Sequence, residues 1–405
     1  MQGVNFERIL GGVCAPEGFL ASAVSCGIKG NGELDLALLY SELPAVAAGV
    51  FTTNELEAAP VTYSRKGIAE KAARAVVINS GNANSMTGKR GLADAEAMAT
   101  AVEKDLSLSS GQVLVASTGP IGEYLPMEKV ANGIKQAVAE LSPGGNTDAS
   151  KGIMTTDTYP KELAVEMEIA GNVVRMGAMA KGAGMIHPDL ATMIVVITTD
   201  VELDADVMQD WLSKAVEWSF NRISVDGDQS TNDTVLMLAN GAAFPEGHSL
   251  NGEEGELFFK ALCWLTANLA MALVKDGEGA TKFLRIVVNG ARDDEEAVQV
   301  ARSIANSNLV KCSFYGGIPN WGRIASAAGS AGVTLERGKI DIFIGESLVV
   351  SGGEPAGADT RDIEKLLKRE EVEITLDLGL GSGSAYFLTT DLSTDYVKMN
   401  ASEIT

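Results

Sequence analysis

Histidine is scarce in this sequence: among 405 residues, only His187 and His248 are present. A catalytic centre that depends on a histidine base, such as a Ser-His-Asp triad or a Cys-His pair, therefore has very few candidates. The scarcity favours interpretations in which the nucleophile is activated by another group.

Cysteine is also rare, and no two cysteines form a CxxC pair. Their spacing does not match the ligands of a zinc site, so we expect no metal and no disulfide framework. Two glycine-rich segments lack nucleotide-binding patterns: Thr87–Gly91 has no GxxxxGK[ST] spacing, and no helix is predicted after Gly379–Gly383. The sequence predicts no bound cofactor. Reduced, buried thiols are expected at Cys14, Cys26, Cys263 and Cys312.

Long apolar runs are absent, although 46% of the residues are hydrophobic. No run reaches about 18 residues, so no membrane-spanning segment is expected. The first twenty residues carry Glu7 and Arg8 and lack the apolar core of a signal peptide. These absences predict a soluble cytoplasmic protein.

Positive charge is in deficit, because 32 lysines and arginines face 54 aspartates and glutamates, for a formal net charge of −22. A field of this sign repels phosphate backbones, so nucleic acid is not an expected partner. An anionic substrate such as glutamate would need a local cation, and Lys181 is a candidate for that cation.

The segment 181–200, KGAGMIHPDLATMIVVITTD, has two halves of opposite character. The first half, through Pro188, is rich in glycine and predicts a loop. The second half contains a β-branched run, Met193–Thr199, that predicts a buried strand. Thr192 stands at the junction. If the preceding bond from Ala191 were cleaved, Thr192 would gain an α-amine with an ordinary pKa of about 7.7–8.0, which could act as base for its own hydroxyl. The alternative is a glycine loop that leads into a core strand, since threonine is common in strands.

The motif KGAGMIHPDLATM resembles the signature of the glutamate N-acetyltransferase (ornithine acetyltransferase) family. Other segments resemble the same family, in family order, and together they extend over almost the whole chain. They are Gly12–Pro16, Phe51–Asn54, Asn79–Asn84, Ser117–Gly119, Asn221–Asp228, Asp276–Lys282 and Pro319–Ile324.

The resemblance implies a self-cleaving acyltransferase of cyclic arginine biosynthesis. It would move the acetyl group from N2-acetyl-L-ornithine to L-glutamate through an acetyl-Thr192 intermediate. Cleavage between Ala191 and Thr192 would give chains 1–191 and 192–405, assembled as an α2β2 heterotetramer. The sequence leaves open whether acetyl-CoA serves as a further acetyl donor.

The resemblance also implies site residues. Thr118 and Gly119 would form the oxyanion hole, because a glycine amide beside a threonine hydroxyl at a strand end offers two donors; the alternative is an ordinary turn. Lys181 could instead be a solvated loop lysine, and Glu278 a turn residue. The substrate-binding residues implied by the family are Thr155, Lys181, Thr192, Glu278, Asn400 and Thr405.

Two further features are interpreted as structural. His187 lies inside the key loop, where we expect it to shape the loop, because a freed threonine amine supplies its own base. Asp226 and Asp228 lack the glycine and distal glutamate of a calcium-binding loop. They are predicted to form a turn that supports the site.

The alternation of short strands and helices predicts layered α/β or α+β architecture and argues against a helical bundle. The resemblance implies an α+β fold: an αββα-type sandwich with N-terminal-nucleophile-like layers over 1–282 and a smaller C-terminal α/β lobe over 283–405, whose tail returns to the active site. Local patterns predict a short helix over 68–73 and a strand edge over 153–158. A hairpin is predicted with its turn at Ala170-Gly171.

Two other functions remain open from the sequence. An N-terminal-nucleophile aminopeptidase or amidase would use the same nucleophile, with water as the acyl acceptor. A non-catalytic amino-acid-binding protein on the same fold would retain Lys181 and Glu278 but would not need Thr192 to be freed.

Overall fold

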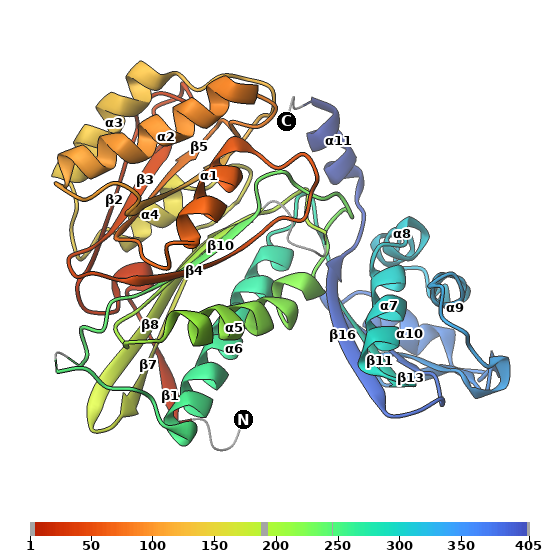
Figure 1. Cartoon of the computed structure of the whole chain (residues 1–405). Helices are drawn as coiled ribbons and strands as arrows, with labels where there is room; N and C mark the ends of the chain where they lie inside the picture. Colours follow the sequence, from red (N-terminus) through yellow and green to blue (C-terminus); the bar gives the residue numbers. More distant parts are fainter. Residues whose placement is uncertain (1–4, 188–192, 245, 403–405) are drawn as a thin grey trace.

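The structure, a computed structural model, describes residues 5–187, 193–244 and 246–402 (Figure 1). Its first sheet has the strand order β1-β7-β8-β9-β10-β4. The β-branched run after the glycine-rich loop forms its centre, where β9 pairs with β8 antiparallel and with β10 parallel. The strands are β1 (Phe6–Ile9), β4 (Val46–Phe51), β7 (Lys161–Ile169), β8 (Asn172–Lys181), β9 (Ile194–Thr199) and β10 (Thr234–Ala239).

The second sheet has the order β2-β3-β5-β6. Strands β5 and β6 are parallel, so their carboxyl ends meet at one edge, where Ser80 lies opposite Thr118. The apolar runs of these strands predict burial on both faces, and every residue of β5 and β6 is buried. The strands are β2 (Phe19–Val24), β3 (Leu36–Ser41), β5 (Ala75–Ser80) and β6 (Val113–Thr118).

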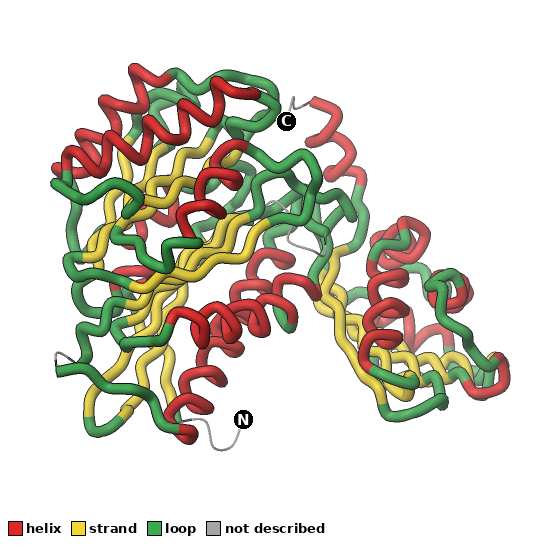
Figure 2. Tube along the Cα trace, in the orientation of Figure 1, coloured by secondary structure: helices red, strands yellow, loops and turns green. Residues whose placement is uncertain are grey.

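The two sheets pack face to face between two pairs of helices. Their shared core joins Met179 and Val196 of the first sheet to Leu39 and Ile78 of the second. Figure 2 shows both sheets in yellow between the red helices. Because the layers run helix, sheet, sheet, helix, the predicted αββα sandwich is confirmed. The helices outside the first sheet are α5 (Ala205–Glu217) and α6 (Gly252–Lys275), and those outside the second are α2 (Gly88–Asp105) and α3 (Met127–Ala139).

A third sheet of order β14-β13-β12-β15-β11-β16 lies in the C-terminal part of the chain and has a hydrophobic core of its own. Four helices belong to this part: α7 (Asp294–Ala305), α8 (Asn308–Tyr315), α9 (Trp321–Gly329) and α10 (Thr360–Leu366). Its strands are β11 (Phe283–Ala291), β12 (Asp341–Ile344), β13 (Ser347–Ser351), β14 (Glu354–Pro355), β15 (Glu371–Asp377) and β16 (Gly383–Thr390).

The last helix, α11 (Thr394–Ser402), leaves the third sheet and lies against the sandwich. In Figure 1 it stands beside the loops at the upper end of the sandwich, above α8, and Tyr315 of α8 lies within hydrogen-bonding distance of Thr394 at 3.1 Å. Backbone close approach fixes it there: a Cβ on Gly279 would lie 2.3 Å from the Tyr396 nitrogen. The end of the described chain therefore returns to the sandwich.

Helix α6 is the one described helix with the length and hydropathy of a membrane span, and 50% of its most apolar window is buried. It packs on strands of the first sheet through Phe258, Leu262 and Leu269. These contacts are those of a core helix.

Three local predictions need correction. The helix predicted at 68–73 is wrong, because α1 (Ala59–Ile68) begins with Pro60 in its first turn and ends where the prediction began. The strand edge predicted at 153–158 is wrong, because this segment is a loop after α4 (Asn146–Gly152). Helix α4 was not predicted, since glycines stand directly before it. Lys181 is the last residue of strand β8 and lies before the loop. The hairpin that turns at Ala170-Gly171 is confirmed.

Candidate active site

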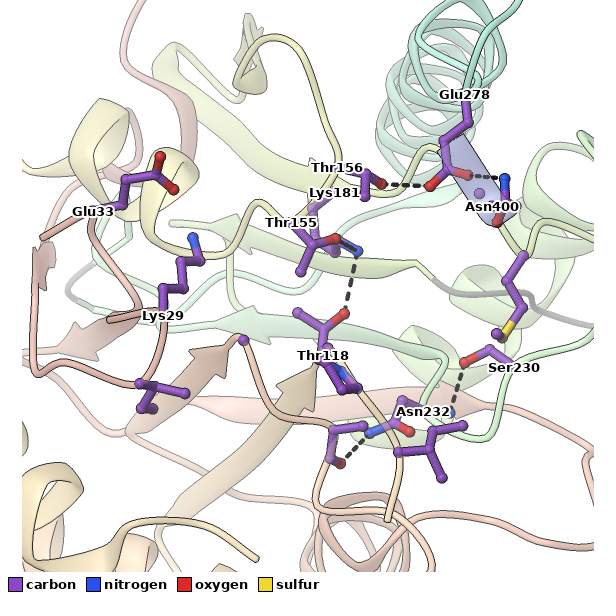
Figure 3. A pocket seen from close by; sticks show the side chains of 18 of the residues that line it. Lys29, Glu33, Thr118, Thr155, Thr156, Lys181, Ser230, Asn232, Glu278 and Asn400 are labelled. Carbon is purple, nitrogen blue, oxygen red and sulfur yellow. Dashed lines mark hydrogen bonds between the residues drawn. The ribbon is translucent and has the colours of Figure 1, made fainter. Parts of the chain in front are cut away.

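A pocket of about 490 Å³ lies at the edge where both sheets of the sandwich end. Thr118 ends β6 on one side, Lys181 ends β8 on the other, and Asn400 reaches it from α11. Its size suits a small amino-acid derivative. Figure 3 shows Thr118, Thr155 and Lys181 at its centre, with Glu278 and Asn400 to one side.

The Lys181 amine is fully enclosed, with 1% of the residue exposed. Its Nζ donates to Thr118 Oγ1 at 3.2 Å and to Thr155 Oγ1 at 2.8 Å. Burial lowers the Lys181 pKa, while the carboxylate of Asp157 opposes that change. Since the lysine occupies an acceptor site on the Thr118 hydroxyl, the hydroxyl proton remains available to the pocket.

Gly119 has a backbone that only glycine tolerates at low cost. Its φ is +137°, and a Cβ would lie 2.4 Å from the Asn82 nitrogen and 2.5 Å from the Gly81 carbonyl carbon. Within the described part of the chain, no hydrogen bond uses the Gly119 N–H. The Thr118 hydroxyl and the Gly119 amide thus provide two neighbouring donors at the pocket wall.

A buried ion-pair network stands behind this wall. Lys161 Nζ lies 2.6 Å from Asp157 Oδ1 and 2.5 Å from Asp276 Oδ2, and all three side chains are at most 2% exposed. Asp157 also accepts the N–H of Thr155 at 3.1 Å. Burial raises the Asp157 pKa, but Lys181 and Lys161 outweigh burial and hold the pKa below its ordinary value. The network fixes the Thr155 backbone beside Lys181.

Glu278 joins the loop after β8 to helix α11. Its carboxylate accepts from Thr156 Oγ1 at 2.7 Å and from Asn400 Nδ2 at 2.9 Å. Gly184 packs flush against it, since a Cβ there would lie 2.4 Å from Glu278 Cδ. A substrate amine in this part of the pocket would meet an ionisable carboxylate that is already oriented.

Two further aspartates hold the loop between β8 and β9. Asp226 accepts the N–H groups of Met185 at 2.6 Å and Ile186 at 2.9 Å, and burial raises its pKa to about 6. The predicted supporting turn is thus present. Asp233 is fully buried; its Oδ1 accepts the Met193 N–H at 2.8 Å, and its Oδ2 has no partner among the described residues. Burial raises the Asp233 pKa well above its usual value.

Six of the residues implied by the sequence line this one pocket: Thr118, Gly119, Thr155, Lys181, Glu278 and Asn400. Ala191, Thr192 and Thr405 lie outside the described residues. In the sequence Thr192 directly precedes Met193, whose N–H is held by Asp233.

Sequence reasoning missed several neighbours. Asn232 fastens the two walls of the pocket by donating to the carbonyl oxygens of Ala83 at 2.7 Å and Ser117 at 2.9 Å. Its position inside the STND segment gave a polar signal, whereas nothing local distinguished Lys29 or Glu33. The other missed residues are Thr156, Lys161, Ser230, Asp233 and Asp276.

The histidines and the cysteines do not line the pocket. His248 stacks on Phe244 with ring centroids 4.6 Å apart, and its Nε2 lies 3.0 Å from Glu254 Oε2. The four cysteines are free, and burial raises the pKa of Cys14 and of Cys26 to about 12. Cys312 is exposed, so the expectation that every thiol is buried is wrong. Among the described residues, no group of three or more His, Cys, Asp or Glu side chains could hold a metal ion.

Comparison with known proteins places this chain in a family. The sequence matches the ArgJ family over residues 20–405. The arginine biosynthesis bifunctional protein ArgJ of Symbiobacterium thermophilum is 44% identical over 398 residues, which cover 98% of this chain and 99% of the relative. The chain belongs to the ArgJ family. The ArgJ of a Synechocystis strain is likewise 44% identical, over 411 residues that cover 98% of each chain.

Solved structures of the ArgJ family are also similar to this chain. The ArgJ of Bacillus halodurans is 38% identical, with a TM-score of 0.48, and the match covers 52% of this chain and 98% of that one. Ornithine acetyltransferase of Mycobacterium tuberculosis, in complex with ornithine, is 44% identical, with a TM-score of 0.43, and the match covers 46% of this chain and 100% of that one. The family predicted from the sequence is confirmed, and the protein is an enzyme of a family that acts in arginine biosynthesis.

Proposed function

We propose that this ArgJ-family protein moves the acetyl group of N2-acetyl-L-ornithine to L-glutamate through an acetyl-Thr192 intermediate. The observation that carries the proposal is the pocket in which a buried Lys181 amine orients the Thr118 hydroxyl beside the Gly119 amide. These donors suit a carbonyl oxygen that becomes negatively charged during acyl transfer. Because its relatives are named bifunctional, we extend the proposal to acetyl-CoA as a second acetyl donor.

The chemistry proceeds in two half-reactions. The α-amine of processed Thr192 takes the proton of its own hydroxyl, and Oγ forms a bond with the acetyl carbon. The oxyanion receives hydrogen bonds from Thr118 and Gly119, the C–N bond to ornithine breaks, and the departing amine takes the proton. The α-amine of glutamate then attacks acetyl-Thr192 by the reverse steps. Each oxyanion donor contributes about 3–4 kcal/mol in comparable sites.

The proposal includes processing and assembly. Cleavage between Ala191 and Thr192 would free the amine, and the chains 1–191 and 192–405 would form an α2β2 heterotetramer in the cytoplasm. Aspartates support the loop on both sides of that bond, through the N–H groups of Ile186 and Met193. We also propose that 1–282 and 283–405 act as sandwich and lobe, since residues of the third sheet have their own core.

A transfer assay tests the function. Purified protein is given acetylornithine or acetyl-CoA in separate reactions, each with and without glutamate, and acetylglutamate is measured. We expect glutamate-dependent product, a second fragment that begins at Thr192, and no transfer by Thr192→Ala. Ornithine release that does not depend on glutamate and yields acetate would instead indicate an amidase. Active enzyme with Met1 as its single N-terminus would refute the mechanism.

A further inference from the structure

Among the described residues, four charged side chains line the pocket, two cations and two carboxylates: Lys29, Glu33, Lys181 and Glu278. Lys181 and Glu278 stand at the centre and at one side, and both are hydrogen-bonded to protein hydroxyls or amides. In Figure 3, Lys29 and Glu33 lie on the opposite side of Thr118 and Lys181 from Glu278. The reaction described above assigns no role to this outer pair.

The loop that carries Lys29 is rigid. The buried carboxylate of Asp35 accepts four successive backbone N–H groups, from Cys26 to Lys29, at distances of 2.6–3.1 Å. A carboxylate that satisfies four donors fixes the backbone of the whole turn. Lys129 Nζ adds a bond of 2.9 Å to the Gly27 carbonyl oxygen. Lys29 therefore starts from an ordered position at the pocket rim.

One residue, Gly81, separates the aliphatic part of the Lys29 side chain from Gly119. A Cβ on Gly81 would lie 2.9 Å from Lys29 Cγ, and a Cβ on Gly119 would lie 2.9 Å from Gly81 Cα. The stem thus packs on Gly81, which in turn packs on Gly119. Lys29 and Gly119 thus line the same pocket with Gly81 between them.

Both outer charges have hydrogen-bonding capacity to spare. Lys29 Nζ donates to the Leu34 carbonyl oxygen at 2.8 Å, and an ammonium carries two more donors. Among the described residues, no hydrogen bond or ion pair uses the Glu33 carboxylate, and none joins Glu33 to Lys29. Burial lowers the Lys29 pKa, whereas Glu33, Asp35 and Asp157 oppose that change. Lys29 and Glu33 are therefore close enough to interact electrostatically, but no ion pair joins them among the described residues.

We propose that Lys29 and Glu33 form the subsite that reads the far end of the substrate side chain. Glu33 binds the terminal ammonium of the acetyl donor, and Lys29 binds the terminal carboxylate of the acetyl acceptor. This rests on the proposed function, in which a single pocket must take a cationic and an anionic side chain in turn. A pair of opposite charges at one side of the pocket serves both half-reactions.

The test measures Michaelis constants for each substrate in processed Lys29→Met and Glu33→Gln. We expect Lys29→Met to raise the Michaelis constant for glutamate about tenfold, the equivalent of about 1.4 kcal/mol, with little change for acetylornithine. Glu33→Gln should raise the Michaelis constant for acetylornithine about tenfold, with little change for glutamate. Lys29→Met should also lose the preference for glutamate over glutamine as acceptor. Lys135→Met, an exposed lysine of helix α3, removes the same charge elsewhere and should match wild type.

Calorimetric binding of glutamate and of ornithine, without turnover, separates this inference from the proposed function. Weaker glutamate binding with unchanged ornithine binding in Lys29→Met supports the subsite even if wild type transfers no acetyl group. An equal rise in both Michaelis constants would assign Lys29 to loop support and overturn the proposal. A change in the Michaelis constant for acetyl-CoA alone would also overturn the proposal, because it would make Lys29 a phosphate contact. Unchanged Michaelis constants in both variants would overturn it as well.

Discussion

The two ends of the segment between β8 and β9 are each held by a buried aspartate, yet the pKa values of the two aspartates move in opposite directions. Asp157 accepts the N–H of Gly182, just after β8, at 2.7 Å, and Asp233 accepts the N–H of Met193, just before β9, at 2.8 Å. The Asp157 pKa lies below the ordinary value because Lys181 and Lys161 outweigh burial, whereas burial alone dominates at Asp233 and raises its pKa.

Both aspartates are buried, so the presence of a paired lysine explains why the pKa falls at one end and rises at the other. At the β8 end, Lys161 neutralises Asp157 and Asp276, so an ionised network can stand directly behind Lys181. At the β9 end, Asp233 Oδ2 has no hydrogen-bond partner among the described residues, and burial raises the pKa of this carboxyl. The two ends therefore differ in whether a lysine pairs with the aspartate, and the two pKa values move in opposite directions.

The largest effect should follow from removing Lys161, the cation that Asp157 and Asp276 share at the β8 end. Lys161→Met leaves Asp157 and Asp276 buried without their shared cation, which should lower the free energy of unfolding by about 3–5 kcal/mol. Denaturant unfolding of the purified protein measures it. Lys66→Met removes an exposed lysine of α1 and is the matched control. Equal stability of Lys161→Met and wild type would contradict a charged network at this end.

A loss of comparable size is expected in catalysis when the Thr118 hydroxyl, which Lys181 orients, is removed. Thr118→Ala should lower kcat about 10²–10³-fold with little change in folding, because one oxyanion donor is removed. Thr118→Ser keeps the hydroxyl and should retain most of the activity. An unchanged kcat in processed Thr118→Ala would make Ser117-Thr118-Gly119 an ordinary turn.

The pH dependence of stability should distinguish the two aspartates. The lowered Asp157 pKa contributes stability that is complete above the unfolded value of 3.8 and is lost as pH falls through the folded pKa. The raised Asp233 pKa contributes stability that is present below 3.8 and is lost as pH rises through the folded pKa.

Asp157→Asn and Asp233→Asn should therefore give different profiles when each is compared with wild type. Between about pH 4 and pH 8 the first difference should stay flat. As pH rises from about 4 toward the folded pKa of Asp233, wild type should lose stability relative to Asp233→Asn by up to about 1.4 kcal/mol per pH unit. Unfolding curves at several pH values provide the measurement. Parallel profiles for the two variants would remove the contrast between the ends.

The smallest effect is expected from the histidines. Neither lines the pocket, and His248 is bound to Glu254 at the start of α6. Processed His187→Ala and His248→Ala should keep a kcat close to wild type, and activity should rise through one ionisation near the α-amine range of about 7.7–8.0. A general base contributes about 10²–10⁴ in rate, so a loss of that size in processed His187→Ala would identify the imidazole as the base.

The local sequence was sufficient for elements whose signal is complete within the segment. The hairpin around Ala170-Gly171 and the strand before Thr199 follow from alternation and from a β-branched run. Loop 153–158 was not predictable in this way, because its conformation depends on Asp157 and Asp276 meeting Lys161 across the fold. Its three threonines are typical of strands, so the local pattern predicted a strand edge.

By itself, the sequence determined the family, the layered fold and six residues of the pocket, because each is encoded by a contiguous motif or a local pattern. Only the tertiary structure decided that Lys181 is fully buried, that Lys161 stands behind it, and that Lys29 and Glu33 share its pocket. The physical reason is that charge states and pocket walls depend on groups brought together from distant segments. Desolvation and pairing act through space, and a linear motif does not record which groups become neighbours.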